Sequence, residues 1–155
     1  MNILFFMTPK QDIAYIYEDS TLRQALEKWG RHRYATIPVI KRTGEYVGSI
    51  SEGDLLWGIK NTAGMDMSKC EDTPISSFAR LRDYKAVPVT TSMNDLLAAA
   101  ITQNFVPVVD DRKIFIGMVR RQAILEYFYR TAKDRPELSG LKEISNLLDR
   151  SKKEE

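Results

Sequence analysis

The pattern of apolar and polar positions predicts the same order of elements in two successive stretches of the chain. In the first stretch the predicted elements are a strand (13–17), a helix (22–31), two strands (37–41 and 45–50) and a helix (52–61). The first helix places Leu22, Ala25, Leu26 and Trp29 on one face, which is typical of a helix that packs on a core. Between the two paired strands, Gly44 can adopt the positive φ of a tight hairpin turn.

The second stretch repeats the first. Its predicted elements are a strand (86–89), a helix (93–103), a hairpin that turns across 110–113 and a helix (121–133). Thr21 at the start of the first helix corresponds to Ser92, an offset of 71, and both precede a helix as N-cap candidates. Thr36 corresponds to Phe105, an offset of 69, so the second repeat has lost two residues in between.

The repeated order is β-α-β-β-α, which predicts an α/β (α+β) fold. A strand, a crossover helix and a second strand form a right-handed parallel pair, and the hairpin adds an antiparallel edge. One such unit leaves an apolar sheet face uncovered, so we expect the two repeats to pack against each other.

The boundaries follow from the repeats. We predict a first repeat over residues 1–60, a linker over 61–74, a second repeat over 75–133 and a charged tail over 134–155. In the tail, apolar residues have helical spacing at Leu141, Ile144, Leu147 and Leu148. The tail is therefore either a short docking helix or a frayed end.

Composition narrows the function. The chain has 155 residues, 43% of them hydrophobic, and a formal net charge of +2, so no strong field favours nucleic acid. No apolar run approaches the roughly 20 residues that span a bilayer, and we expect a cytoplasmic protein without membrane contact. One cysteine, Cys70, and one histidine, His32, cannot form an internal disulfide or a metal site of usual ligand number. No catalytic motif occurs, which argues against an enzyme.

Particular segments in this order resemble tandem cystathionine-β-synthase (CBS) repeats, as found in a stand-alone Bateman module. Residues 6–9 (Phe-Met-Thr-Pro) and 75–78 (Ile-Ser-Ser-Phe) resemble the starts of CBS repeats, and the Ile-Pro-Val and Val-Pro-Val strands resemble their middle. The resemblance covers about residues 1–133. It implies two repeats related by a pseudo-twofold axis, with two clefts between them that can each bind an adenosine-containing ligand.

Residues 48–54 match the nucleotide motif of that family: glycine, two largely apolar positions, Ser or Thr, two variable positions and Asp. The resemblance implies that Asp54 accepts ribose hydroxyls, while Ser51 and helix N–H groups face phosphate. It places the adenine near Ile13, Ala14, Tyr34, Ala35, Thr36 and Ile37. The alternative is that Ser51 is only an N-cap and Asp54 only an acidic first-turn residue.

The second repeat departs from the motif. Arg120 stands where Ser or Thr is expected, and Ala123 stands where Asp is expected, which puts a ribose site of this repeat in doubt. Arg120 and Arg121 either contact phosphate in the other cleft or are solvated surface residues.

The resemblance favours a regulatory module that binds AMP, ADP, ATP or cyclic di-AMP as ligand and requires no cofactor. Since we see no effector domain in this sequence, we expect the signal to pass through a homodimer or a protein partner. The alternative is a protein-interaction scaffold whose ligand pocket is vestigial.

Overall fold

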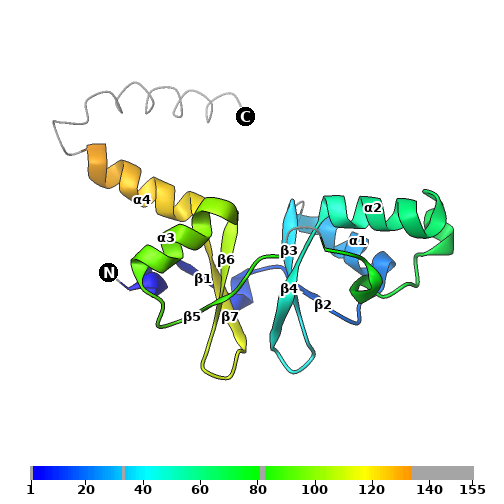
Figure 1. Cartoon of the computed structure of the whole chain (residues 1–155), viewed down its shortest axis with the longest axis horizontal. Helices are drawn as coiled ribbons and strands as arrows, with labels where there is room; N and C mark the ends of the chain where they lie inside the picture. The colour runs from blue at the N-terminus through cyan, green and yellow to red at the C-terminus, as the bar shows by residue number, and fades with distance from the viewer. Residues whose placement is uncertain (1, 33, 81–82, 134–155) are drawn as a thin grey trace.

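The computed structural model describes residues 2–32, 34–80 and 83–133, and the predicted tail lies outside them. Within these ranges the chain forms two similar halves (Figure 1). The first half contains β2 (Ile16–Tyr17), α1 (Leu22–His32), β3 (Thr36–Ile40), β4 (Tyr46–Ser51) and α2 (Glu52–Ala63). The second half contains β5 (Val87–Pro88), α3 (Met93–Thr102), β6 (Phe105–Val109), β7 (Phe115–Arg120) and α4 (Arg121–Lys133). The predicted β-α-β-β-α order is confirmed in both halves.

Each half has its own hydrophobic core, formed where two helices cover one face of a small sheet. In the first half Leu22 and Trp29 of α1 and Leu55 of α2 pack against Ile37 and Ile50 of the sheet. In the second half Leu96 of α3 and Ile124 of α4 pack against residues of β6 and β7. The face of α1 that was inferred from apolar spacing is therefore a buried face.

The strand topology is the same in both halves and fits the predicted hairpins. β2 is parallel to β3 and β3 antiparallel to β4, while β5 is parallel to β6 and β6 antiparallel to β7. Gly44 has a φ of 95° in the first hairpin turn, as predicted, and Lys113 takes the equivalent place with a φ of 65°.

The first strand of each half is shorter than predicted, and a proline explains the difference. β2 begins at Ile16 rather than at residue 13. Ile16 lies opposite Val39, and the N–H of Glu18 donates to the C=O of Ile40 at 3.0 Å. These two observations determine which N–H and C=O groups pair along the ladder between β2 and β3. Two residues earlier, the C=O of Ala14 would need an N–H from Pro38, which has none. Pairing therefore starts only after this point.

An N-terminal segment crosses to the second half, which the sequence analysis did not predict. β1 (Met7–Pro9) pairs antiparallel with β7, with Met7 opposite Val119, giving the sheet order β1-β7-β6-β5. Just before it, Ile3 and Phe6 enter the core of the second half. In return, Ile75 and Phe78 enter the core of the first half. Each half is thus completed by the segment that leads into the other.

The two hairpins lie side by side at the centre of the molecule and join the halves (Figure 1). The N–H of Phe115 donates to the C=O of Gly44 at 2.9 Å, and the N–H of Tyr46 donates to the C=O of Lys113 at 3.2 Å. The Tyr46 hydroxyl also donates to the C=O of Tyr84 at 2.6 Å. Burial raises the pKa of Tyr46, and the carboxylate of Asp83 raises it further, so this phenol stays a donor.

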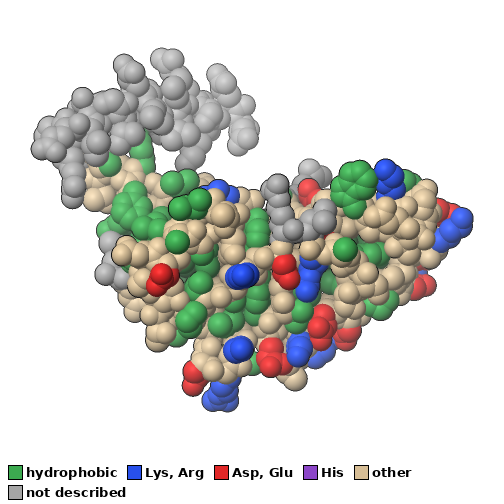
Figure 2. Space-filling view, viewed as in Figure 1, with side chains coloured by type: hydrophobic (Ala, Val, Ile, Leu, Met, Phe, Trp, Pro, Cys, Tyr) green, Lys and Arg blue, Asp and Glu red, His purple; other side chains and the backbone are tan. Residues whose placement is uncertain are grey.

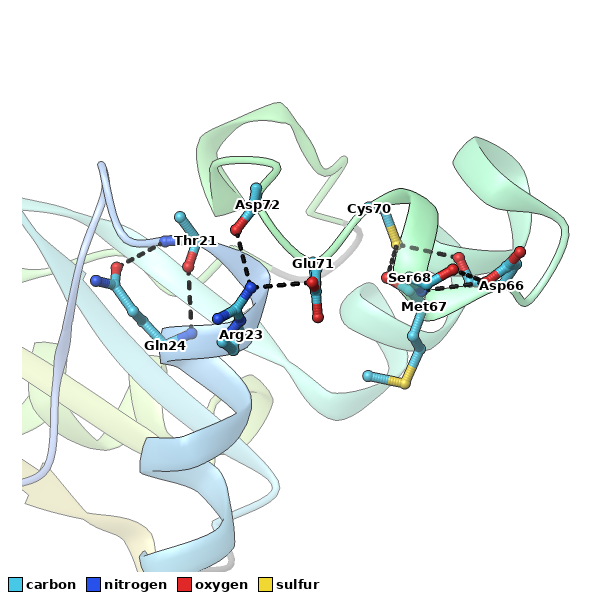
Figure 3. A network of polar contacts seen from close by, with 9 residues as sticks. All are labelled: Thr21, Arg23, Gln24, Asp66, Met67, Ser68, Cys70, Glu71 and Asp72. Atoms are coloured by element: carbon cyan, nitrogen blue, oxygen red, sulfur yellow. Dashed lines mark hydrogen bonds and ion pairs between the residues drawn. The ribbon is translucent and has the colours of Figure 1, made fainter.

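The predicted linker is docked on the first half rather than extended. Figure 3 shows the Arg23 guanidinium of α1 on the carboxylates of Glu71 and Asp72, at 2.9 and 3.3 Å. The N–H groups of Leu22 and Arg23 donate to linker carbonyls, each at 2.9 Å, which satisfies N–H groups that a helix start leaves unpaired. The thiol of Cys70, with the residue only 1% exposed, lies in the same core.

Candidate functional site

A hollow of about 530 Å³ lies between the two halves, where residues that precede the hairpins meet the start of α4. We call it cleft 1. Its volume is within the range of small-molecule sites. It is lined by Ala14, Tyr34, Ala35, Thr36, Pro38, Asn104, Phe105, Met118, Arg120, Arg121, Gln122 and Leu125.

Strand pairing brings these residues together. Phe105 lies opposite Arg120 in the second half, so the residues before β6 sit beside the first turn of α4. The N–H of Arg121 donates to the C=O of Asn104 at 2.9 Å, which holds that junction. From the first half, Tyr34 and Thr36 reach the same hollow because they lead into β3.

The main chain of Ala14 supplies a polar edge to an otherwise apolar wall. Pro38 cannot donate to the C=O of Ala14, as the strand order shows. Within the described residues, neither the N–H nor the C=O of Ala14 has a hydrogen-bond partner in the protein. An N–H donor and a C=O acceptor on one residue match the adjacent acceptor and donor of a planar base edge.

The lining of cleft 1 also has a basic end, formed by Arg120 and Arg121 where β7 leads into α4. The Arg120 guanidinium lies 5.9 Å from the centre of the Tyr34 ring. Arg121 donates to the side chain of Asn104 and to the C=O of Ile101, the latter at 3.4 Å. Neither arginine forms an ion pair with a carboxylate of the described residues. With the positive end of α4 beside them, this end of the cleft favours an anion.

Ser51 and Asp54 do not line cleft 1, although Ser51 pairs with a residue that does. Ser51 lies opposite Thr36 in the ladder and caps α2: its hydroxyl accepts from the N–H of Asp54 at 3.0 Å. In return, a carboxylate oxygen of Asp54 accepts from the N–H of Ser51 at 2.8 Å. Ser51 is therefore an N-cap of α2, which both readings of this residue allow. Asp54 itself is only 2% exposed, although Glu52 and Gly53 in the same helical turn are exposed. A ligand contact by either residue stays a prediction.

Of the residues predicted for the base, Ala14, Tyr34, Ala35 and Thr36 line cleft 1, whereas Ile13 and Ile37 do not. Ile37 lies in the core of the first half. Ile13 lines a larger and more open hollow of about 650 Å³. There the ammonium groups of Lys10 and Lys28 lie 5.3 and 5.1 Å from the Tyr15 ring centre. Both lysines therefore make cation–π contacts with Tyr15.

The pseudo-equivalent hollow, cleft 2, is lined by Asp83, Tyr84, Lys85, Thr102 and Gln103 and has a volume of about 480 Å³. Gln103 corresponds to Tyr34 by the offset of 69, and Lys85 corresponds to Ala14 by the offset of 71. Here the polar edge is occupied: the N–H of Lys85 donates to the Gln103 carboxamide oxygen at 2.8 Å. Gln103 was not predicted as a site residue, although these offsets point to its position.

In the part of the chain that the structure describes, no group of three or more His, Cys, Asp or Glu residues could hold a metal ion. No helix of that part is long and apolar enough to cross a bilayer. The site that the structure offers is a cleft whose lining combines a main-chain polar edge with guanidinium groups.

A comparison with protein families matches the CBS domain to residues 4–61 and 75–130. None of the curated proteins matches the chain. The structure resembles a CBS domain protein from Streptococcus pneumoniae, with a TM-score of 0.75 and 23% identity over 84% of this chain and 88% of that one.

Two similar solved structures hold a nucleotide. The CbpB protein of Listeria monocytogenes, in complex with cyclic di-AMP, has a TM-score of 0.73 and 20% identity over 84% of this chain and 97% of that one. CBSX2, in complex with AMP, has a TM-score of 0.65 and 23% identity over 84% of this chain and 97% of that one. At these identities the likeness concerns the fold.

Proposed function

This chain belongs to the CBS domain family, and from that premise we propose that it is a regulatory module that binds an adenine nucleotide in cleft 1. The observation that carries the proposal is that one cleft combines a main-chain polar edge with two guanidinium groups. The main chain of Ala14 offers a donor and an acceptor without partners among the described residues. Arg120 and Arg121 line the same cleft.

The polar edge suits adenine. Its amino group is a donor adjacent to a ring nitrogen that accepts, so it can bond the C=O and the N–H of one residue together. Ala14, Pro38 and Met118 provide apolar surface beside that edge. Phosphate groups then meet Arg120 and Arg121, whose guanidinium groups form strong charge-assisted hydrogen bonds with phosphate oxygens.

Similar proteins support the ligand class. CbpB has been solved with cyclic di-AMP and CBSX2 with AMP. We rank cyclic di-AMP together with AMP and ATP as ligands of this chain, and ADP belongs to the same class. Binding favours one packing of the halves, and a partner that prefers this packing responds.

A thermal-shift assay tests the proposal. We expect AMP, ATP or cyclic di-AMP to raise the melting temperature, because a ligand at a hundredfold excess over its dissociation constant stabilises the folded state by about 2.7 kcal/mol. GMP and cyclic di-GMP serve as matched controls and should have much smaller effects. If all of the adenine ligands, ADP included, leave the melting curve unchanged, the chain is better described as a scaffold with a vestigial pocket.

Replacement of Asp54 by alanine tests the predicted ribose contact. We expect Asp54→Ala to weaken AMP binding in isothermal titration, and also to lower the free energy of unfolding by about 1 kcal/mol because the capping box is lost. Asp95→Ala is the control, since Asp95 accepts from the Ser92 hydroxyl at 2.7 Å at the start of α3, outside cleft 1. If both variants lose stability and neither loses affinity, Asp54 is only a capping residue.

The output of the module passes to a second copy of the chain or to another protein, and no catalytic step is involved. Apolar side chains exposed on α2 and α4 support such an interface: Leu56 and Trp57 on α2, and Leu125 and Phe128 on α4. In the view of Figure 2, hydrophobic side chains lie along the upper edge of the molecule, over both halves. A cytoplasmic location agrees with this function.

A further inference from the structure

Cleft 2 repeats the polar edge of cleft 1. The N–H of Val89 donates to the C=O of Val109 at 3.0 Å, so the order of bonds between β5 and β6 matches that between β2 and β3. Counting back along this ladder, the C=O of Lys85 would need an N–H from Pro107, which has none. Cleft 2 would therefore offer a main-chain donor and acceptor on Lys85, as cleft 1 does on Ala14.

The side chain of Gln103 occupies this edge. Its oxygen accepts from the N–H of Lys85 at 2.8 Å, and its amino group donates to the C=O of Lys85 at 3.1 Å. The same amino group lies 3.3 Å from the C=O of Phe105, to which it donates. Gln103 is only 8% exposed. A carboxamide presents an acceptor beside an NH₂ donor, which is the pattern of the adenine edge.

From these contacts we infer that Gln103 is an internal stand-in for a nucleobase, which occupies the polar edge of cleft 2 and leaves one adenine site per chain. The inference rests on the proposed function of cleft 1. It goes further because it assigns Gln103 a role in excluding ligand. Tyr34, at the equivalent position of cleft 1, cannot make this pattern, because a phenol has no second polar atom beside its hydroxyl.

The charges around cleft 2 define what would enter if Gln103 were removed. Asp83 accepts from the N–H of Ser49 at 2.8 Å, and Arg80 lies 3.4 Å from the Asp83 carboxylate. The residue that corresponds to Arg121 by the offset of 69 is Glu52. The charges of Asp83 and Arg80 offset each other, and Glu52 stands where cleft 1 has the guanidinium of Arg121. An opened cleft 2 therefore lacks the proposed phosphate contact and takes neutral adenosine in preference to AMP.

Isothermal titration with adenosine tests the inference on three proteins. We expect one equivalent of adenosine for the wild type and two for Gln103→Ala, while AMP gives one equivalent in both. Thr102→Ala is the matched control and should bind one: Thr102 lines the same hollow, but its hydroxyl donates only to the C=O of Ala99, at 3.3 Å.

Each outcome is decisive. Two equivalents in the wild type, or one in a folded Gln103→Ala protein, would overturn the exclusion by Gln103 while leaving the proposed function standing. If neither adenosine nor AMP bound to the wild type or to Gln103→Ala, the exclusion by Gln103 and the proposed function would both be overturned.

A measurement on the wild type covers the case in which Gln103→Ala does not fold. In NMR spectra, the side-chain NH₂ signals of Gln103 should exchange slowly and stay in place as adenosine is added, while the amide signal of Ala14 shifts. Movement of both groups would show that a base displaces Gln103 and would contradict the inference.

Discussion

Replacement of Gly117 by alanine is expected to lower the free energy of unfolding by about 3 kcal/mol, at the upper end of what overpacking usually costs. A Cβ at Gly117 would lie 2.5 Å from the carbonyl oxygen of Thr8 and 2.8 Å from the side chain of Met7. The first contact is with backbone in a paired strand, so relief requires β1 to move away from β7. Ile3 and Phe6 would then lose their place in the second core. Urea denaturation measures the loss.

Gly30→Ala is the matched control. Gly30 lies within α1, and a Cβ there would meet nothing within 4 Å. Because glycine is about 1 kcal/mol less favourable than alanine inside a helix, this variant should gain up to that amount. The two variants make the same chemical change with opposite expected signs. Equal unfolding midpoints for both would show that β1 contributes little to the stability of the second half.

The repeats and their hairpins could be predicted because the signals are local. Apolar residues on one face of α1 and a glycine in the first turn each fix their element within a few residues. The same order of elements in the second repeat also supports the elements predicted for the first. Two units that each expose an apolar sheet face have to cover it, which made the packing of the halves predictable as well.

Features that depend on contacts between distant segments were not predictable in this way. The pairing of β1 with β7 joins residues far apart in sequence, and no pattern within residues 7–9 selects that partner. The burial of Asp54 also depends on tertiary packing, because an acidic residue in a first helical turn is usually exposed. For Gln103, the repeat offsets point to its position, but neither its residue type nor its spacing indicates the hydrogen bonds to Lys85 that the structure shows.

Replacement of Arg120 by alanine should weaken AMP binding about tenfold to a hundredfold and leave adenosine binding nearly unchanged. A hydrogen bond to a charged group contributes about 1.5–3 kcal/mol, and each 1.4 kcal/mol is a factor of ten in affinity. Arg120 is placed for this role, since it lines cleft 1 without an ion-pair partner among the described residues. Isothermal titration of each variant with both ligands gives the ratio that isolates the phosphate contribution.

Variants of Arg121 and Arg112 distinguish a direct contact with phosphate from a general effect of positive charge. Arg121→Ala should also weaken AMP, ATP and cyclic di-AMP more than adenosine, but with some loss for adenosine, because its guanidinium holds Asn104 at the wall of the cleft. Arg112→Ala removes the same charge from the exposed turn of the β6–β7 hairpin and should change neither affinity, since screening at physiological salt limits charges beyond about 8 Å. Equal losses of AMP and adenosine in Arg120→Ala would mean that this arginine shapes the cleft through Tyr34 and does not contact phosphate.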